Sequence, residues 1–214
     1  MATGFRVLAF RVRVKAILKN VEASIQGIKR LMFQPAEEGG AGGKRMVEEG
    51  VVDLSPPAQH AFGMHVWPTL PTGSIATRPG PLLAAAETFI IEIVGKGGHV
   101  AMPHLTRDPV VTASSLIMNL QTIVSGILSP LESGVVSVTA ISAGDAFNVI
   151  PASALIKGTV RALSTEMLMD LRDKVERITK STAALYGCSS TISYSPNYYP
   201  PTVNDAELFK WAQF

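Results

Sequence analysis

Two adjacent glutamates, Glu37 and Glu38, stand between an apolar run and a glycine-rich stretch in the sequence LMFQPAEEGGAGGKRMVEEG. Adjacent carboxylates repel one another, so burial of both requires a nearby cation or a proton on one of them. Neighbouring side chains diverge in an extended segment, so Glu38 can bind a metal ion while Glu37 exchanges protons with water or substrate. The same pair is also common on exposed helix surfaces, where it has no chemical role.

A histidine, His65, closes the apolar stretch HAFGMHV further along the chain. Imidazole is the commonest side-chain metal ligand, and the end of a strand beside a cleft suits that role. A purely structural histidine is the alternative at this position.

Two more histidines, His99 and His104, lie in GKGGHVAMPH, directly after a predicted strand. The stretch is not a dinucleotide-binding motif, because Val100 stands where the last glycine should be and Pro103 interrupts the helix that should follow. The three glycines of GKGG tolerate positive φ, so we expect a tight loop that presents a histidine to an open site. An ordinary turn explains the glycines equally well.

Asn148 lies in a predicted loop, DAFNVIP, and Arg161 lies on the strand that follows it. A side-chain amide can donate to a developing oxyanion, and a guanidinium can pair with a carboxylate. Solvent exposure alone would account for Arg161.

The elements expected in the first part of the chain are short. We predict a short helix, a strand at 28–33 that Pro35 ends, a second helix in GKRMVEEG with Gly50 at its C-terminus, and a strand at 60–66. The proline- and glycine-rich stretch at 68–81 indicates a linker or a crossover between domains.

A regular pattern begins after this linker. ETFIIEIVG, GVVSVTAIS, SALIKGTVRAL and CSSTISYS read as strands, and 109–125 and 165–186 read as helices, the first with its apolar side at Val110, Leu116, Leu120 and Val124. The order is β-α-β-β-α-β, the ferredoxin-like arrangement in which two helices cover one face of a four-stranded antiparallel sheet. We therefore predict a self-contained α+β domain at about 82–195.

The composition excludes several classes of protein. The chain has 214 residues, 47% of them hydrophobic, and a net charge of +2, which suits one large or two small globular domains. We expect no nucleic-acid partner, because basic residues cluster only at the amino terminus, and no membrane span, because there is no uninterrupted apolar run of about 18 residues. The single cysteine, Cys188, excludes an internal disulfide and suggests a reducing compartment.

The first twenty residues contain five basic residues and no acidic one, which is the charge bias of an organellar transit peptide. Alternation of apolar and basic residues at 10–15 favours an exposed edge strand instead. We expect a soluble protein of the cytoplasm or an organelle.

Four stretches, in this order and spacing, closely resemble the amidohydrolase branch of the M20 metallopeptidase family: FQPAEEGGAGGKRMVEEG, GMHVWPTLPTGSIATRPGPLLAA, GKGGHVAMPHLTRDPV and GDAFNVIPASALIKGTVRAL. The branch includes hippurate hydrolases, N-acyl-amino-acid deacylases and plant hydrolases of indole-3-acetic acid conjugates. The resemblance implies a partial α/β catalytic domain at 1–81, with 1–13 atypical, then a satellite dimerisation domain at 82–195, and a return to the catalytic domain at 196–214.

The resemblance also implies a role for the glutamates and the first histidine. Glu37 is expected to be the general base that activates water, and Glu38 and His65 are expected to bind a pair of divalent ions, Mn²⁺, Zn²⁺ or Co²⁺. The family's upstream Cys-Gly-His-Asp segment and its C-terminal histidine ligand do not occur in this sequence, which suggests a fragment.

On the substrate side, His99 is expected to stabilise the oxyanion, often across a dimer interface, and Asn148 to contact the substrate. Arg161 is expected near the substrate carboxylate, and His104 belongs to the same substrate-binding motif. The implied function is hydrolysis of N-acyl amino acids by a homodimer, with auxin conjugates as one candidate substrate. The alternative is a non-catalytic homologue that acts as a dimerisation or interaction module.

Overall fold

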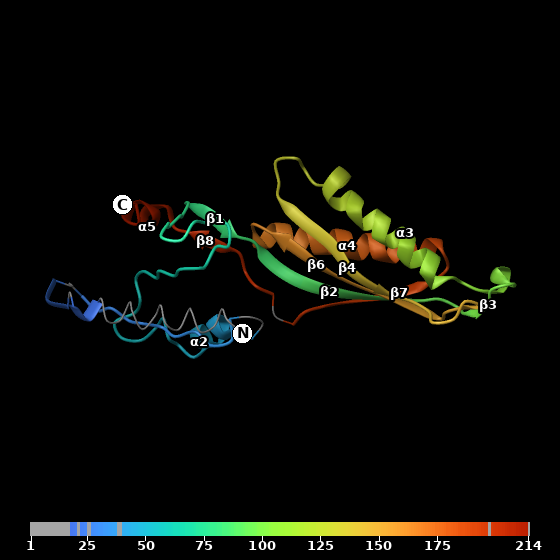
Figure 1. Ribbon diagram of the computed structural model, residues 1–214, viewed down its shortest axis with the longest axis horizontal. Helices are drawn as coiled ribbons and strands as arrows, with labels where there is room; N and C mark the ends of the chain where they lie inside the picture. Colours follow the sequence, from blue (N-terminus) through green and yellow to red (C-terminus); the bar gives the residue numbers. More distant parts are fainter. Residues whose placement is uncertain (1–17, 21, 25–26, 38–39, 197, 214) are drawn as a thin grey trace. The chain divides into compact units, whose positions relative to one another are not determined.

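The computed structural model describes residues 18–20, 22–24, 27–37, 40–196 and 198–213 (Figure 1). The chain divides into two compact units, Met1–Phe62 and Gly63–Phe214. The basic start of the chain, predicted as a transit-like segment or an edge strand, lies mostly outside the described residues. The domain boundaries expected near 81 and 195 stay predictions.

The described residues of the first unit include helical residues at 18–20, a short 3₁₀ helix, η1 (Glu22–Ser24), and helix α2 (Gly42–Glu48). Gly50, the predicted terminal glycine, lies just past α2 with φ +80°, a backbone conformation that strains other residues. Its N–H donates to the carbonyl of Val47 over 2.9 Å. The predicted glycine end of this helix is therefore confirmed.

Two predicted strands, 28–33 and 60–66, are wrong, because the structure has irregular backbone in both segments. A strand is held by hydrogen bonds to a neighbouring strand, and within the described part of the chain neither segment has a β partner. Their apolar side chains, including Ile28 and Phe62, are exposed. Apolar composition alone was not sufficient to form a strand.

The second unit is built on a four-stranded sheet with the strand order β4-β6-β2-β7 and antiparallel neighbours throughout. Its strands are β2 (Ala85–Val94), β4 (Gly134–Ser142), β6 (Ser153–Ala162) and β7 (Ser189–Tyr194). Helix α3 (Pro109–Thr122) follows β2, and helix α4 (Thr165–Leu185) follows β6. The succession of elements is thus β-α-β-β-α-β, as the alternation of the sequence indicates.

Both helices lie on one face of this sheet (Figure 1). Because strand side chains alternate between faces, Phe89, Ile91 and Ile93 of β2 point into the core, while Ile90 and Val94 remain partly exposed. The whole buried cluster of apolar residues that the structure describes falls between Ala85 and Cys188. This part of the chain therefore has a hydrophobic core of its own.

Helix α3 continues into a π-helical turn, η3 (Ile123–Ile127). Leu116, Leu120 and Ile123 are fully buried, whereas Val124, predicted on the same side, is 41% exposed. The run Pro109–Ile127 is long and apolar enough to cross a membrane by length and composition. Its serines, threonines and amides interrupt the apolar residues, and 28% of its apolar window is buried in the protein, where Leu116, Leu120 and Ile123 face the core.

Side chains cap the starts of both long helices. Asp108 accepts a hydrogen bond from the N–H of Val110 over 2.8 Å at the start of α3. Ser164 accepts one from the N–H of Met167 over 3.1 Å at the start of α4. These contacts satisfy backbone donors that a helix start leaves free, and each contributes about 1 kcal/mol.

One ion pair lies on the core side of the sheet. Glu87 of β2 is almost fully buried, and its Oε2 lies 3.4 Å from Nη1 of Arg172 in α4, without the geometry of a hydrogen bond. The guanidinium stands 4.1 Å over the ring of Tyr194. Burial raises the pKa of Glu87, an effect that the charge of Arg172 opposes, and burial raises the pKa of Tyr194 to about 12.

Two small sheets complete the second unit. Strand β1 (Gly80–Leu83) pairs with β8 (Thr202–Asn204), which precedes helix α5 (Ala206–Trp211). Strand β3 (Gly98–His99) pairs with β5 (Val149–Ile150) at the end of the main sheet where β2 ends and β6 begins (Figure 1). We call the β3 and β5 pair the β3–β5 ribbon.

Candidate active site

The predicted general base, Glu37, is exposed in a tight turn before α2. Ala36, directly before it, has φ +46°, and Ala41 has φ +50°. These are left-handed conformations that cost a residue with a Cβ about 1–2 kcal/mol. The turn closes where the N–H of Gly40 donates to the carbonyl of Ala36 over 3.1 Å. Strained backbone of this kind concentrates at functional sites, and Glu38, the predicted metal ligand, lies outside the described residues.

The glycines after the glutamates let the chain fold back on itself. A Cβ on Gly42 would lie 1.8 Å from the carbonyl oxygen of Pro35. Helix α2 can therefore begin against the turn only if its first residue is glycine.

His65, the other predicted metal ligand, is exposed, and its Nδ1 lies 2.6 Å from the carbonyl oxygen of Val66. A carbonyl oxygen can only accept, so Nδ1 carries the proton. In the neutral ring Nε2 then keeps its lone pair, which is the arrangement common among histidines that bind metal through Nε2. His65 and Glu37 belong to different units, so the distance between them is not defined.

His99, the predicted oxyanion donor, has the opposite tautomer. Its Nδ1 accepts a hydrogen bond from the N–H of Ala101 over 3.1 Å, so Nδ1 is unprotonated and Nε2 carries the proton of the neutral ring. The ring is exposed on the β3–β5 ribbon. The exposed Nε2–H can donate to an oxygen that becomes negatively charged.

The ribbon brings His99 and Asn148 to neighbouring backbone positions. His99 is the β partner of Val149, and the N–H of Val100 donates to the carbonyl of Asn148 over 3.1 Å. Asn148 itself lies in the turn before β5 and is exposed. Two residues 49 positions apart in the sequence thus meet at the same end of the sheet.

The glycines before His99 do not act as the sequence suggested. None of Gly95, Gly97 and Gly98 has a left-handed φ. Their role is close packing, because a Cβ on Gly95 would lie 2.1 Å from the carbonyl oxygen of Arg107 and a Cβ on Gly97 would lie 2.6 Å from that of Ile150. The expectation of positive φ was wrong, and the glycines instead hold the ribbon against its neighbours.

The two remaining predicted residues lie outside the β3–β5 ribbon. Arg161 is exposed on β6, opposite Ala86 of β2. It lies eight residues after Ser153, the first residue of β6. Eight residues of strand span about 26 Å. His104 is exposed in a 3₁₀ turn, η2 (Pro103–Leu105), five residues after His99. The structure does not bring Arg161 to the ribbon.

The described residues do not fit a metal ion by themselves. Among them there is no group of three or more His, Cys, Asp or Glu side chains placed to hold one. A catalytic metal usually has three protein ligands and one open position.

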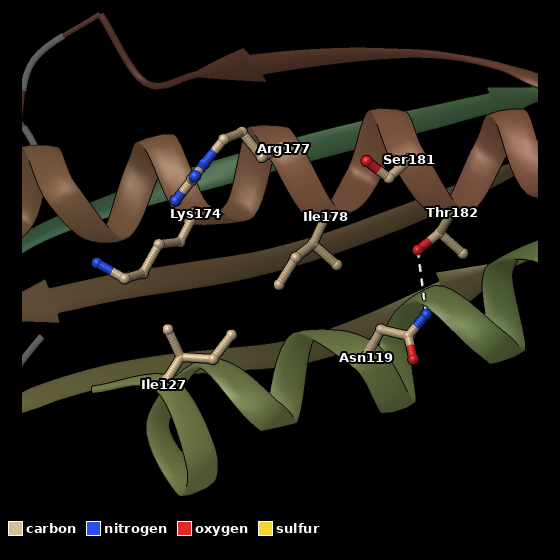
Figure 2. Close-up of a pocket in the computed structure, with 7 residues that line it drawn as sticks. All are labelled: Asn119, Ile127, Lys174, Arg177, Ile178, Ser181 and Thr182. Atoms are coloured by element: carbon tan, nitrogen blue, oxygen red, sulfur yellow. Dashed lines mark hydrogen bonds between the residues drawn. The ribbon is translucent and has the colours of Figure 1, made fainter. Parts of the chain in front are cut away.

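A hollow of about 490 Å³ lies between α3 and α4, where Ile178 points from α4 toward α3 (Figure 2). It contains none of the predicted site residues. Its cations are already compensated, because Lys174 pairs with Asp170 and Arg177 pairs with Asp173. The hollow therefore shares no lining residue with the candidate site, and its two cations already have carboxylate partners.

Two apolar residues beside the predicted pair were not singled out from the sequence. Phe147, next to Asn148, is fully exposed, and Val149, the β partner of His99, is half-exposed. Knowledge of the pairing register was needed to find Val149. An aromatic residue in an exposed turn was the available signal for Phe147.

Comparison with known proteins gives consistent relatives. The model of peptidase family M20/M25/M40 matches residues 8–213. The IAA-amino acid hydrolase ILR1-like 4 of Arabidopsis thaliana is 42% identical over 198 residues, which make up 91% of this chain and 44% of the relative. The N-acetyl-L-cysteine deacetylase of Bacillus subtilis (strain 168) is 38% identical over 192 residues, which make up 90% and 45%.

Solved structures agree with these relatives. A putative aminohydrolase from methicillin resistant Staphylococcus aureus matches with a TM-score of 0.77 and 36% identity, over 83% of this chain and 47% of that one. The Bacillus subtilis YXEP protein, described as a dinuclear metal binding peptidase from the M20 family, matches with 0.72 and 34%, over 92% and 48%. The mixed α/β fold is therefore shared with these proteins, and the chain spans less than half the length of the curated relatives named above.

Proposed function

Since this chain belongs to peptidase family M20/M25/M40, we propose that it contributes the general base and the oxyanion donor of a metal-dependent hydrolase of N-acyl amino acids. The observation that carries the proposal is the hydrogen bond of 3.1 Å that the N–H of Ala101 donates to Nδ1 of His99. Its Nδ1 is occupied by the N–H of Ala101, so the exposed Nε2–H is available as a donor. The substrate class follows the relatives, whose names specify an IAA-amino acid and N-acetylcysteine.

Each residue has a specific task in the proposed reaction. The carboxylate of Glu37 takes a proton from the attacking water and returns it to the leaving amine. The Nε2–H of His99 donates to the carbonyl oxygen as negative charge develops there. The side-chain amide of Asn148 donates to the substrate from the neighbouring backbone position.

The metal site is proposed on the chemistry of the donors alone. Glu38 and His65 are the proposed ligands of divalent ions, and the lone pair left on Nε2 of His65 supports this assignment. The ions themselves, Mn²⁺, Zn²⁺ or Co²⁺, are not distinguished by these donors.

His104 and Arg161 stay proposed substrate-binding residues. His104 shares the loop of His99, which supports its assignment. The position of Arg161 near the far end of β6 gives no support to contact with the group that His99 holds.

We further propose that 82–195 is a ferredoxin-like satellite domain that forms a homodimer. Its strand order and its separate core support an independent domain. Light scattering after size-exclusion chromatography should give twice the chain mass, and a monomer at micromolar concentration would reject the dimer.

The function is tested by grafting. The 198 matched residues would replace their counterparts in the Arabidopsis relative, so that the rest of a full-length hydrolase surrounds them. We expect metal-dependent release of free amino acid from N-acyl amino acids. A folded, metal-loaded graft that releases none would reject the proposal.

An interaction module is the second candidate. It is favoured by one observation, namely that the described residues contain a complete core but no complete metal site. Wild-type hydrolysis by the graft would reject this alternative.

A further inference from the structure

The surroundings of His99 and Asn148 are apolar and exposed. The four residues that flank them in the chain, Gly98, Val100, Phe147 and Val149, carry no charge, and the last three expose large apolar side chains. Surface apolar residues are ordinary when scattered singly, but three of them directly next to polar catalytic candidates in the chain indicate a contact site.

The pairing register places one of these side chains directly beside the imidazole. The N–H of Val100 donates to the carbonyl of Asn148, so the adjacent pair of His99 and Val149 is the non-hydrogen-bonded kind. In such pairs both side chains lie on the same face with their Cβ atoms about 4.5–5.5 Å apart. The side chains of Val149 and His99 therefore share one face of the ribbon.

The structure of an N-acyl amino acid indicates which part of the substrate contacts Val149. If the Nε2–H of His99 binds the carbonyl oxygen of the substrate, the acyl chain begins at the atom bonded to the carbonyl carbon. The acyl chain then lies within reach of the ribbon face that carries His99 and Val149. The amino-acid part ends in a carboxylate, which favours a cation as its partner. Uncharged, apolar flanking residues suit the acyl chain instead.

We infer that Val149 and Phe147 form the contact surface for the acyl group, and that the site favours large apolar acyl groups over acetyl. We call these two residues the acyl-contact pair. The inference rests on the proposed function, because it takes the carbonyl oxygen to be held by His99. It adds a substrate preference that the proposed function leaves open.

Binding to the 214-residue chain is the direct test, because it requires no turnover. The probes are N-hexanoylglycine and N-acetylglycine, and the readout is the methyl NMR signals of Val149. A fully buried methylene strengthens binding about fourfold. With four additional methylenes partly covered, we expect the hexanoyl ligand to bind at least about tenfold more tightly and to shift Val149.

Substitutions locate the effect. Phe147→Ala should reduce the preference to less than about threefold. Leu131→Ala, which removes another almost fully exposed apolar side chain from the turn before β4, should leave it unchanged. Equal affinity for the two probes, no shift at Val149 with either probe, or equal effects of the two substitutions would each overturn the inference.

The grafted hydrolase separates this inference from the proposed function. Hydrolysis of both N-acylglycines with equal kcat/KM, unchanged by Phe147→Ala, would overturn the acyl-contact pair and leave the proposed function standing. Preferential binding of the hexanoyl probe by the chain, together with an inactive graft, would support the contact surface and reject hydrolysis.

Discussion

The helix-covered sheet of Ala85–Tyr194 and the first unit, Met1–Phe62, use similar apolar residues to different effect. Phe89 in β2 is 1% exposed, whereas Phe33 in the first unit is 47% exposed, although both lie in short apolar runs. The difference is that β2 has a hydrogen-bonded strand on each side and helices over one face, while the described residues give 28–33 no strand partner. An apolar run forms a strand only where the chain supplies neighbouring strands for its backbone hydrogen bonds.

The greatest loss of stability is expected for a core substitution, which we compare with a substitution at an exposed position. Leu116→Ala in α3 removes a fully buried side chain, and we expect the free energy of unfolding to fall by about 2–5 kcal/mol. Phe62→Ala removes an exposed side chain of the first unit and should cost less than about 0.5 kcal/mol. Urea unfolding followed by circular dichroism measures both, and equal losses would show that the two regions do not differ in packing as described.

A second prediction concerns the ribbon at the end of the well-packed region. His99→Ala in the grafted hydrolase should lower kcat about 10²–10³-fold, because one oxyanion donor is lost. Metal content measured by mass spectrometry should not change. Loss of metal in this variant would mean that His99 is a ligand and that its oxyanion role is wrong.

A third prediction concerns the buried carboxyl group of the sheet. Burial raises the pKa of Glu87 above its ordinary 4.5, so the protonated form is favoured in the folded state. The associated stability is present below about pH 4.5 and is lost as the pH rises through the folded-state pKa.

Glu87→Gln should remove this decline in the free energy of unfolding between pH 4.5 and 7, as measured by urea titrations at several pH values. Glu92→Gln, on the exposed face of the same strand, is the matched control and should keep the decline. An unchanged pH profile in Glu87→Gln would contradict the assignment.

The smallest expected effect concerns the start of α4. Ser164→Ala removes the acceptor for the N–H of Met167 and should cost about 1 kcal/mol. Ser164→Asn retains an acceptor and should cost less. If the two variants unfold at the same urea concentration, the hydrogen bond does not stabilise the helix start.

Sequence patterns predicted the sheet region well and the first unit poorly. Alternation identified β2 and β6, and helical periodicity identified α3 and α4, because these signals reflect burial on one face. The strands expected at 28–33 and 60–66 did not form, since the same pattern says nothing about the presence of a partner. The π turn after α3 also left no sequence signal, so Val124 was placed on the wrong side.

The residues of the candidate site are a prediction from the resemblance, and their local geometry could not be predicted from the sequence. Resemblance supplied His65 and His99, but their tautomers depend on which backbone group each Nδ1 meets, the carbonyl of Val66 in one case and the N–H of Ala101 in the other. No residue pattern contains that information. The proximity of His99 and Asn148 likewise required the topology of the sheet.

We propose that Glu37 is the general base of an amidohydrolase, and the decisive experiment is Glu37→Gln in the grafted hydrolase. We predict a loss of at least about 10² in kcat with unchanged metal content, because glutamine cannot accept the proton of water. Glu49→Gln, at the exposed end of α2 where the carboxylate pairs with Arg45, should retain full activity. An unchanged rate in Glu37→Gln would mean that Glu37 is not the general base.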